Sequence, residues 1–318
     1  MAEIVTLTMN PAIDLSTSVE RVEPVRKLRC GPARREAGGG GINVARVVRR
    51  LGGEVRALYP AGGSVGQLLG RLVEAEGVSH VVVPIGGETR EDVTVLDEAS
   101  DQQYRFVLPG PELSEPEWRA CLEALSALGP GPAIVCASGS LPPGAPEDFY
   151  ARAAAIVRDW GALFVLDTSG PALKAALAAG VDLFKPNLRE LNELVGARLD
   201  GPGQWLDACR ALIARGEART VALSLGADGA LLVSREGAWR APALDIEPLS
   251  TVGAGDSFLG ALVWALADGR PMDEALRCAV AGGSAALLSP GTGLCHAVDL
   301  HRLIGAVRVE AVAAPALG

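Results

Sequence analysis

Residues 250–258 read STVGAGDSF, and they lead directly into the apolar stretch FLGALVWALA at 258–267. The apolar residues of that stretch fall on nearly all faces of a helix, which predicts a helix buried in the core. Asp256 stands at its beginning, on a backbone of glycine and alanine. An aspartate in this place can cap the helix. It can equally act as a catalytic acid–base group beside free N–H groups that bind an anion.

The composition describes a large, acidic chain. Its 318 residues, 49% hydrophobic and 21% charged, suffice for one large domain or two modest ones. The formal charge of −9 without any basic block disfavours nucleic-acid and membrane-surface partners. No signal peptide stands at the start, and the longest apolar stretch is far shorter than the roughly 20 residues of a membrane span. We expect a cytoplasmic protein.

Cysteine, histidine and lysine usage narrows the chemistry further. The six cysteines are scattered without a CxxC pair, which is typical of reduced, buried thiols. The three histidines have no metal-ligand spacing. None of the three lysines, Lys27, Lys174 and Lys185, is preceded by glycine, so a Walker-type phosphate loop is excluded.

Short β-branched runs alternate with helical patterns through most of the chain. The runs that predict strands are 4–9, 55–60, 81–85, 133–137, 163–167, 181–185 and 220–225. The patterns that predict helices are 42–51, 66–76, 115–128, 147–160 and 207–216, and successive helices are expected from 253 to 309. This alternation predicts an α/β fold with a mostly parallel central sheet and helices on both faces.

Two half-polar segments interrupt the alternation. Residues 92–107 alternate with period two around a polar turn, which predicts a hairpin, and residues 13–35 are also strand-like. We expect one domain over residues 1–318 with a small β lid, contributed by about 13–35 and 88–107, that covers a site or forms a dimer contact.

The glycine run in EAGGGGINVAR (36–46) is the first candidate binding motif. Gly39 and Gly40 leave bare backbone for a ligand, and the helix that begins near Ile42 directs its free N–H groups toward it. Asn43 adds a donor and an acceptor. The run lacks the third glycine of a dinucleotide fingerprint, and a tight turn without a ligand is the alternative.

Further candidates follow the predicted strands, whose carboxyl ends are where α/β sheets bind ligands. Asp14, just beyond the first strand, can accept hydrogen bonds from sugar hydroxyls or be a solvated turn residue. The cations Lys27, Arg29 and Arg90 lie in or beside the expected lid. Arg90 is either a phosphate clamp or a surface ion pair.

Three more strand-end turns carry candidate side chains. They are ASGSLPPG (137–144), KPNLREL (185–191) and SLGADG (224–229). In the second, Asn187 and Glu190 lie on one face of a helix start, where they can hold waters of a magnesium ion. The same pair can instead form a capping box.

Together these motifs resemble the ribokinase-like (PfkB) family of carbohydrate kinases over essentially the whole chain. The segment GGGGINVARVVRRLGG (38–53) matches the N-terminal family signature, and STVGAGDSFLGAL (250–262) matches the C-terminal one. KPNLREL supplies the family's Asn-x-x-Glu motif. Within the family, KLRC (27–30), the four glycines and INVAR are most similar to the PfkB-type 6-phosphofructokinase branch. The 1-phosphofructokinases and tagatose-6-phosphate kinases commonly have a lysine in the glycine run, and this chain has none.

The resemblance implies a role for each matching position. Asp256 would be the base, with Gly253, Ala254 and Gly255 as the anion hole. Sugar hydroxyls would be held by Asp14, Gly39, Gly40 and Asn43, and the sugar phosphate by Arg90, Lys27, Ser138, Gly139 and Ser140. Asn187 and Glu190 would organise magnesium. The nucleotide site would be lined by Lys185, Asn187, Ser224, Gly226 and Gly229. Ser250 and Val252 are candidates for a monovalent cation, K⁺, but Gly293 leaves the far side of that loop without a side chain.

The implied reaction transfers the γ-phosphoryl group of MgATP to the C1 hydroxyl of fructose 6-phosphate in a homodimer. Fructose 1-phosphate and tagatose 6-phosphate are alternative substrates. A non-catalytic sugar- or nucleotide-binding regulator is the alternative outside the kinases.

Overall fold

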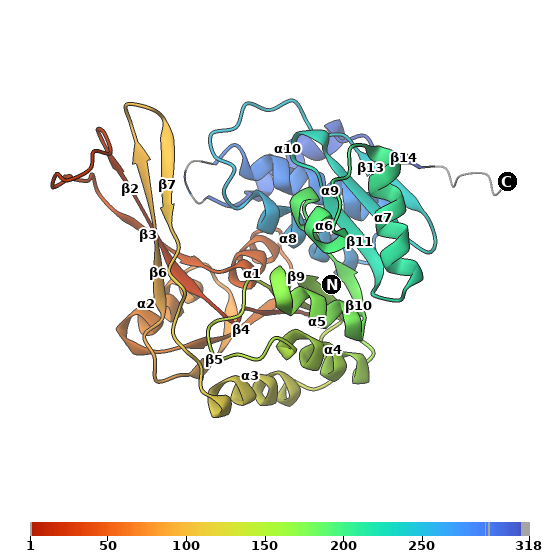
Figure 1. Cartoon of the computed structure of the whole chain (residues 1–318), viewed down its shortest axis with the longest axis horizontal. Helices are drawn as coiled ribbons and strands as arrows, with labels where there is room; N and C mark the ends of the chain where they lie inside the picture. Colours follow the sequence, from red (N-terminus) through yellow and green to blue (C-terminus); the bar gives the residue numbers. More distant parts are fainter. Residues whose placement is uncertain (1, 290, 292, 313–318) are drawn as a thin grey trace.

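Strands from nearly the whole length of the chain join in one central sheet (Figure 1). The computed structural model describes residues 2–289, 291 and 293–312. The sheet has the order β14-β13-β12-β11-β10-β9-β8-β1-β4-β5. The strands are β1 (Ile4–Leu7), β4 (Val55–Ala61), β5 (Ser79–Pro84), β8 (Ile134–Ser138), β9 (Leu163–Asp167), β10 (Val181–Phe184), β11 (Ala218–Ser224), β12 (Ala230–Ser234), β13 (Ala238–Ala241) and β14 (Glu310–Ala311). Neighbours from β5 through β11 pair in parallel, and β12, β13 and β14 pair antiparallel, so the predicted parallel core is confirmed.

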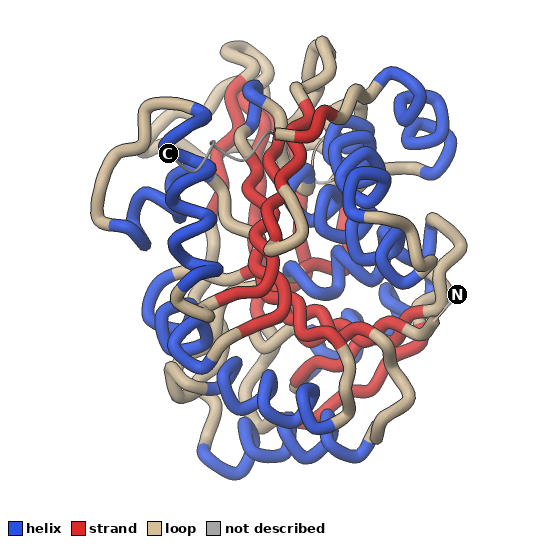
Figure 2. Tube along the Cα trace, turned by 90° about the vertical axis from the view of Figure 1, so that its right-hand side faces the viewer, coloured by secondary structure: helices blue, strands red, loops and turns tan. Residues whose placement is uncertain are grey.

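Helices cover both faces of this sheet, as Figure 2 shows. One face packs against α1 (Gly40–Arg50), α2 (Gly63–Ala75), α8 (Ala254–Ala267), α9 (Met272–Ala286) and α10 (Ala297–Leu303). The other packs against α3 (Glu115–Ala127), α4 (Phe149–Asp159), α5 (Gly170–Ala179), α6 (Leu188–Val195) and α7 (Pro202–Ala214). Alternate strand residues point to opposite faces. Thus Ile134 joins one core cluster and its neighbour Val135 joins the other. This double burial explains the nearly continuous apolar runs.

The apolar stretch after Asp256 forms α8, a core helix as predicted. It packs between α1 and α9, where glycines allow the helix backbones to approach closely. A Cβ atom on Gly260 would lie 2.6 Å from the Val47 Cβ atom, and one on Gly282 would lie 2.6 Å from the Ala261 Cβ atom. The beginning of α8 is therefore held rigidly by its neighbours.

A second sheet of four strands stands beside the core, at the left of Figure 1. It has the order β3-β2-β6-β7, with β2 (Ala12–Val19), β3 (Arg34–Gly38), β6 (Arg90–Asp97) and β7 (Gln102–Phe106). The antiparallel pair β6–β7 confirms the predicted hairpin, while β2 and β6 pair in parallel. Residues 20–33 form no strand, so only the two ends of the segment 13–35 are extended. That this small sheet acts as a lid on a single domain remains a prediction.

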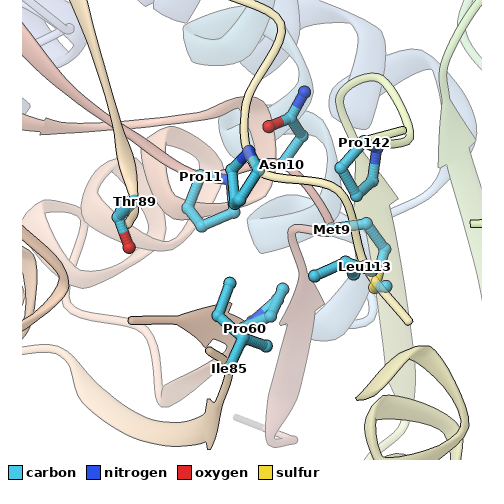
Figure 3. A pocket seen from close by; sticks show the side chains of 9 residues that line it. Met9, Asn10, Pro11, Pro60, Ile85, Thr89, Leu113 and Pro142 are labelled. Carbon is cyan, nitrogen blue, oxygen red and sulfur yellow. The ribbon is translucent and has the colours of Figure 1, made fainter. Parts of the chain in front are cut away.

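Apolar and polar side chains pack where the small sheet joins the core (Figure 3). Pro11 and Thr89, at the starts of β2 and β6, face Pro60 and Ile85 of the core across a cavity of about 10 Å³. Such a volume holds at most one water molecule. The junction therefore fixes the base of the small sheet and leaves no room for a ligand.

Three elements were not predicted from sequence. Helix α5 is short and rich in alanine, so its polar face is weakly marked. Strands β13 and β14 extend the antiparallel edge, and β14 has only two residues, both exposed. Such short edge strands carry little periodicity to detect.

Candidate active site

The beginnings of α8 and α1 and the strands β2 and β7 of the small sheet meet around a pocket of about 220 Å³. It is lined by Asp14, Asn43, Arg105, Thr251, Val252, Gly253, Gly255 and Asp256. Asp14, Asn43 and Asp256, which lie far apart in the sequence, therefore share one pocket as predicted. Arg105 and Thr251 were not anticipated.

Asp256 lies in the first turn of α8, but it does not cap the helix. The N-cap is Gly253, with φ 77°, and no side-chain cap bond is formed there. Instead, the Asp256 Oδ2 atom accepts a hydrogen bond of 2.9 Å from the Asn43 Nδ2 atom on α1. The capping interpretation of Asp256 is therefore wrong, because a glycine in the left-handed conformation occupies that position.

The surroundings of Asp256 favour a proton acceptor active near neutral pH. Burial raises its pKa to about 6, and the negative charges of Asp167 and Asp14 act in the same direction. The Asn43 hydrogen bond and the Lys185 ammonium act the other way. A carboxylate with a pKa near the working pH combines the ionised form with a useful basicity.

The glycine run is packed against protein on several sides. A Cβ atom on Gly38 would collide with the Asp14 carboxylate, and one on Gly40 would collide with Ser138 Oγ. Gly39 has φ +101°, a conformation that favours glycine. The run thus brings the start of α1 against both Asp14 and the turn after β8. Close approach of protein is a reason for glycine that the sequence interpretation, based on a ligand, did not include.

Asp14 faces the pocket from β2, and Arg105 faces it from β7. Burial and the nearby Asp92 raise the pKa of Asp14 to about 6, and the Arg105 guanidinium is the foremost charge that opposes this. Arg105 is exposed and forms no ion pair with any residue that the structure describes. Arg105 reaches the pocket because β7 pairs with β6, and no local sequence pattern marks that position.

Lys185 forms a buried ion pair at the end of β10. Its Nζ atom lies 3.3 Å from the Asp167 Oδ1 atom, and Ser138 gives Asp167 a side-chain hydrogen bond. Burial alone would lower the pKa of Lys185, but Asp167 and Glu190 hold it above its ordinary value. Burial raises the pKa of Asp167 despite Lys185. Asp167 was not predicted, because its role depends on Lys185 at the end of the neighbouring strand.

Asn187 and Glu190 form the capping box that the sequence allowed. Asn187 Oδ1 accepts from the Glu190 N–H, and Glu190 Oε2 accepts from the Asn187 N–H, both at 2.9 Å. Burial raises the pKa of Glu190. Asn187 also bridges to Ser224, which places the turn with Gly226 and Gly229 beside this helix start. A magnesium role for the pair stays a prediction.

The predicted cations Lys27, Arg29 and Arg90 do not line this pocket, unlike Arg105. Lys27 and Arg29 lie on the exposed loop between β2 and β3 and do not line it. Arg90 is mostly buried, and its Nη1 atom lies 3.1 Å from Asp92 Oδ2. Arg90 also donates to the backbone carbonyls of Asn10 and Leu108. Its ion pair is therefore formed, while its Nε atom has no partner among the described residues.

The remaining predicted residues are held by local hydrogen bonds. The Gly139 N–H donates to the Asp167 carbonyl, and Ser140 Oγ accepts from the side chain of Asn10. Ser250 Oγ donates to the Gly291 carbonyl at 2.6 Å and accepts from the Val252 N–H. Residues 290 and 292 of that loop lie outside the described residues.

Three general findings about the described residues follow. Within the described residues, no group of three or more His, Cys, Asp or Glu side chains could hold a metal ion directly. No helix in the same part of the chain is long and apolar enough to cross a membrane. The six cysteines are free, and five of them are buried, as expected.

Comparisons with known proteins agree with this geometry. The model of the pfkB family carbohydrate kinases matches residues 2–298. The ATP-dependent 6-phosphofructokinase isozyme 2 of Mycobacterium tuberculosis is 46% identical over 94% of this chain and 88% of its own length. A 1-phosphofructokinase of Rhodobacter capsulatus is 36% identical over 96% of this chain and 97% of its own. The crystal structure of phosphofructokinase-2 from Escherichia coli in complex with potassium has a TM-score of 0.93 at 40% identity, covering 96% of this chain and 99% of that one.

The chain belongs to the pfkB family of carbohydrate kinases. It is a phosphotransferase with an alcohol group as acceptor, on a ribokinase-like α/β fold.

Proposed function

We propose that this enzyme transfers the γ-phosphoryl group of ATP to the C1 hydroxyl of fructose 6-phosphate, giving fructose 1,6-bisphosphate. The observation that carries the proposal is the placement of Asp256. A carboxylate with a pKa of about 6 lies in the first turn of α8, in one pocket with Asn43 and Asp14. The higher identity to a 6-phosphofructokinase than to a 1-phosphofructokinase supports the choice of substrate.

Asp256 and the beginning of α8 would perform the chemical step. The carboxylate accepts the proton of the attacking C1 hydroxyl, which increases its nucleophilicity. The N–H groups of Ala254, Gly255 and Asp256 have no acceptor within the helix. Together with the turn at Gly253 they form an anion hole that stabilises the charge on the phosphoryl group during transfer.

Residues from the core and the small sheet would bind the sugar phosphate. Asp14, Asn43 and the backbone at Gly39 and Gly40 accept and donate hydrogen bonds to hydroxyls. The phosphate is bound by Arg90, Lys27 and the turn Ser138, Gly139 and Ser140. Lys27 lies on a loop away from the pocket and Arg90 is paired with Asp92, so both require a movement of the small sheet. Such a closure also excludes water, which would compete as a nucleophile.

The nucleotide would lie along the turns after β10 and β11, against Lys185, Asn187, Ser224, Gly226 and Gly229. The donor set there fits magnesium bound through water. Asp167, Glu190 and Asp256 surround the single ammonium of Lys185, so carboxylates outnumber the cation. Glu190 and Asn187 would hold the waters of Mg²⁺, which supplies charge neutralisation at the nucleotide phosphates. The carboxylate and amide of these two residues orient those waters.

The expected monovalent-cation site is formed by Ser250 and Val252. Support comes from the solved relative in complex with potassium. Ser250 is buried and already bonded to Gly291, and Gly293 offers only its backbone. Any bound K⁺ would therefore rely on backbone carbonyls rather than on side chains.

We also propose a homodimer through the small sheet, located in the cytoplasm. Strand β7 and the residues after it expose Phe106, Val107 and Leu108, which are 55, 61 and 50% accessible. A row of exposed apolar side chains on an edge strand favours burial against another chain. A second copy is the occupant that the resemblance implies, and the free thiols suit a reducing compartment.

The experiment that tests the function is a coupled assay of ATP consumption with three substrates side by side. Fructose 6-phosphate, fructose 1-phosphate and tagatose 6-phosphate are compared by kcat/KM under identical conditions. We expect fructose 6-phosphate to exceed the other two at least tenfold, roughly the worth of one good polar contact to the sugar.

The other outcomes are equally informative. Comparable kcat/KM for all three sugars would overturn the assignment to fructose 6-phosphate while retaining the kinase. No turnover with any of them, together with measurable nucleotide binding, would favour a non-catalytic regulator on this fold.

A further inference from the structure

Arg46 is a buried cation that the proposed reaction does not use. It lies on α1, one turn beyond Asn43, and only 2% of it is exposed. Its Nη2 atom lies 2.7 Å from Glu76 Oε1 and 3.2 Å from Glu36 Oε1. A guanidinium buried so completely is costly unless every donor has an acceptor. The hydrogen-bond donors of this one side chain therefore reach acceptors on three different parts of the fold.

One of those donors reaches the site. Arg46 Nη1 donates to Ala37 O at 2.7 Å, directly before the glycine run, and to Asn43 Oδ1 at 3.3 Å. On the other side of the same amide, Asn43 Nδ2 donates to Asp256 Oδ2. The order of contacts is therefore Arg46, Asn43, Asp256.

The chemistry of these groups allows only one orientation of the amide. A guanidinium has donors and no acceptor, and an ionised carboxylate has acceptors and no donor. Asn43 must then turn its oxygen to Arg46 and its NH₂ to Asp256. Without Arg46, the amide could rotate by half a turn and present its oxygen to the carboxylate, which is repulsive.

We propose that Arg46 is a positioning residue that fixes the amide of Asn43 so that its NH₂ group faces Asp256, and that clamps the strand before the glycine run through Ala37. The proposal rests on the proposed function only in assigning Asp256 as the base. Arg46 touches neither substrate nor nucleotide, and it acts through Asn43. Its carboxylate partners lie at the C-terminal cap of α2 (Glu76) and on β3 (Glu36), so the orientation of Asn43 depends on both the core and the small sheet.

Several groups other than Asn43 face Asp256 and contribute to its protonation. They are Asp14 from β2, Cys136 from β8, Asp167 from β9 and Lys185 from β10. None of them hydrogen-bonds to Arg46. The Arg46 charge does lower the pKa of Asp14, so replacing Arg46 also raises that pKa. The Asn43 hydrogen bond lowers the pKa of Asp256. Its loss must therefore raise that pKa.

The test is a Arg46→Gln variant, with the titration of the Asp256 carboxyl followed by NMR and with the pH profile of kcat/KM. We expect the Asp256 titration midpoint and the acid limb of the kcat/KM pH profile to move upward by about one pH unit. The reason is that Asp256 loses the hydrogen bond from Asn43, a bond to a charged group. The variant should fold, since Glu76 keeps Arg50 at 3.0 Å and Glu36 keeps Arg34 at 3.2 Å.

Arg50→Gln is the matched control. Arg50 is also on α1 and also pairs with Glu76, but it has no contact with Asn43. It should leave both midpoints unchanged. A shift with Arg50→Gln as large as with Arg46→Gln would overturn the proposal, since loss of any nearby charge would then suffice.

The second arm repeats Arg46→Gln in an Asn43→Ala background. If Arg46 acts through the amide, the second substitution adds no further shift to the Asp256 titration. An equal shift in both backgrounds, or lowered stability with an unmoved midpoint, would reduce Arg46 to a charge or a structural residue. The NMR readout needs no turnover, so failure of the proposed kinase reaction would remain distinguishable.

Discussion

The core side of the pocket and the small-sheet side of the pocket are built differently. The core side is the beginning of α8, wedged between α1 and α9 by glycines whose Cβ atoms would collide with neighbouring side chains. The other side is a four-stranded sheet, and β7 is exposed along its whole length. Asp256 and Asn43 come from the rigid side, whereas Arg105, Arg90 and Lys27 come from the other. Chemistry that needs fixed distances thus lies in the core, and groups that must close on a substrate lie on the sheet.

The largest effect expected from breaking the rigid side is that of Asp256→Asn. The amide cannot take the proton, so kcat should fall about 10²- to 10⁴-fold. The measurement is kcat by coupled assay. An unfolding temperature at or above that of the parent serves as the control. Near-normal turnover would show that Asp256 is not the base.

Packing on the rigid side is tested by Gly260→Ala. The added methyl group meets Val47 in the tight contact of α1 with α8, which should lower the free energy of unfolding by about 1–3 kcal/mol. Gly203→Ala is the matched control. Gly203 is also helical, on α7, with open space around its Cβ position, so the same change should stabilise by up to about 1 kcal/mol.

Urea denaturation of the two glycine variants should show a lowered free energy of unfolding for Gly260→Ala and a raised one for Gly203→Ala. If Gly260→Ala were as stable as Gly203→Ala, the beginning of α8 would not be held by close packing, and the contrast between the two sides would lose its basis.

The small-sheet side is tested by Arg105→Met. Loss of a charge-assisted contact should raise KM for the sugar phosphate about 10-fold, while the unfolding temperature is unchanged because Arg105 is exposed. Gln102→Met on the same strand is the control and should change neither quantity. A fall in kcat at constant KM would mean that Arg105 acts on the transition state instead.

A further test concerns stability and pH. The folded-state pKa of Asp256 is about 6, above the ordinary value of 3.8, so its favourable contribution is complete below about pH 4 and is lost as the pH rises through 6. Asp256→Asn does not titrate. Relative to the parent, the variant should therefore gain stability between pH 4 and 7, as read from urea midpoints. A constant difference across that range would contradict the raised pKa.

Much of the site could be predicted because its residues stand in local patterns. The strand end at Lys185 and the helix starts at Asn43 and Asp256 are each legible in a single stretch, since parallel sheets gather such positions at one edge. Asp14 was also predicted, although it lies within β2 of the small sheet rather than just beyond a core strand. Arg105 and Asp167 could not be assigned in the same way. Arg105 reaches the pocket only because β7 pairs with β6 in one register, and Asp167 matters only because Lys185 lies opposite it on the next strand.

By itself the sequence determined the alternation of strands and helices, the buried character of α8 and the family to which the motifs belong, because periodicity and short motifs are properties of neighbouring residues. The tertiary structure decided how those pieces act on one another. It placed a glycine rather than Asp256 at the N-cap of α8, and it placed Asn43 between Arg46 and Asp256. Hydrogen bonds between residues 213 positions apart depend on packing, which no local pattern encodes.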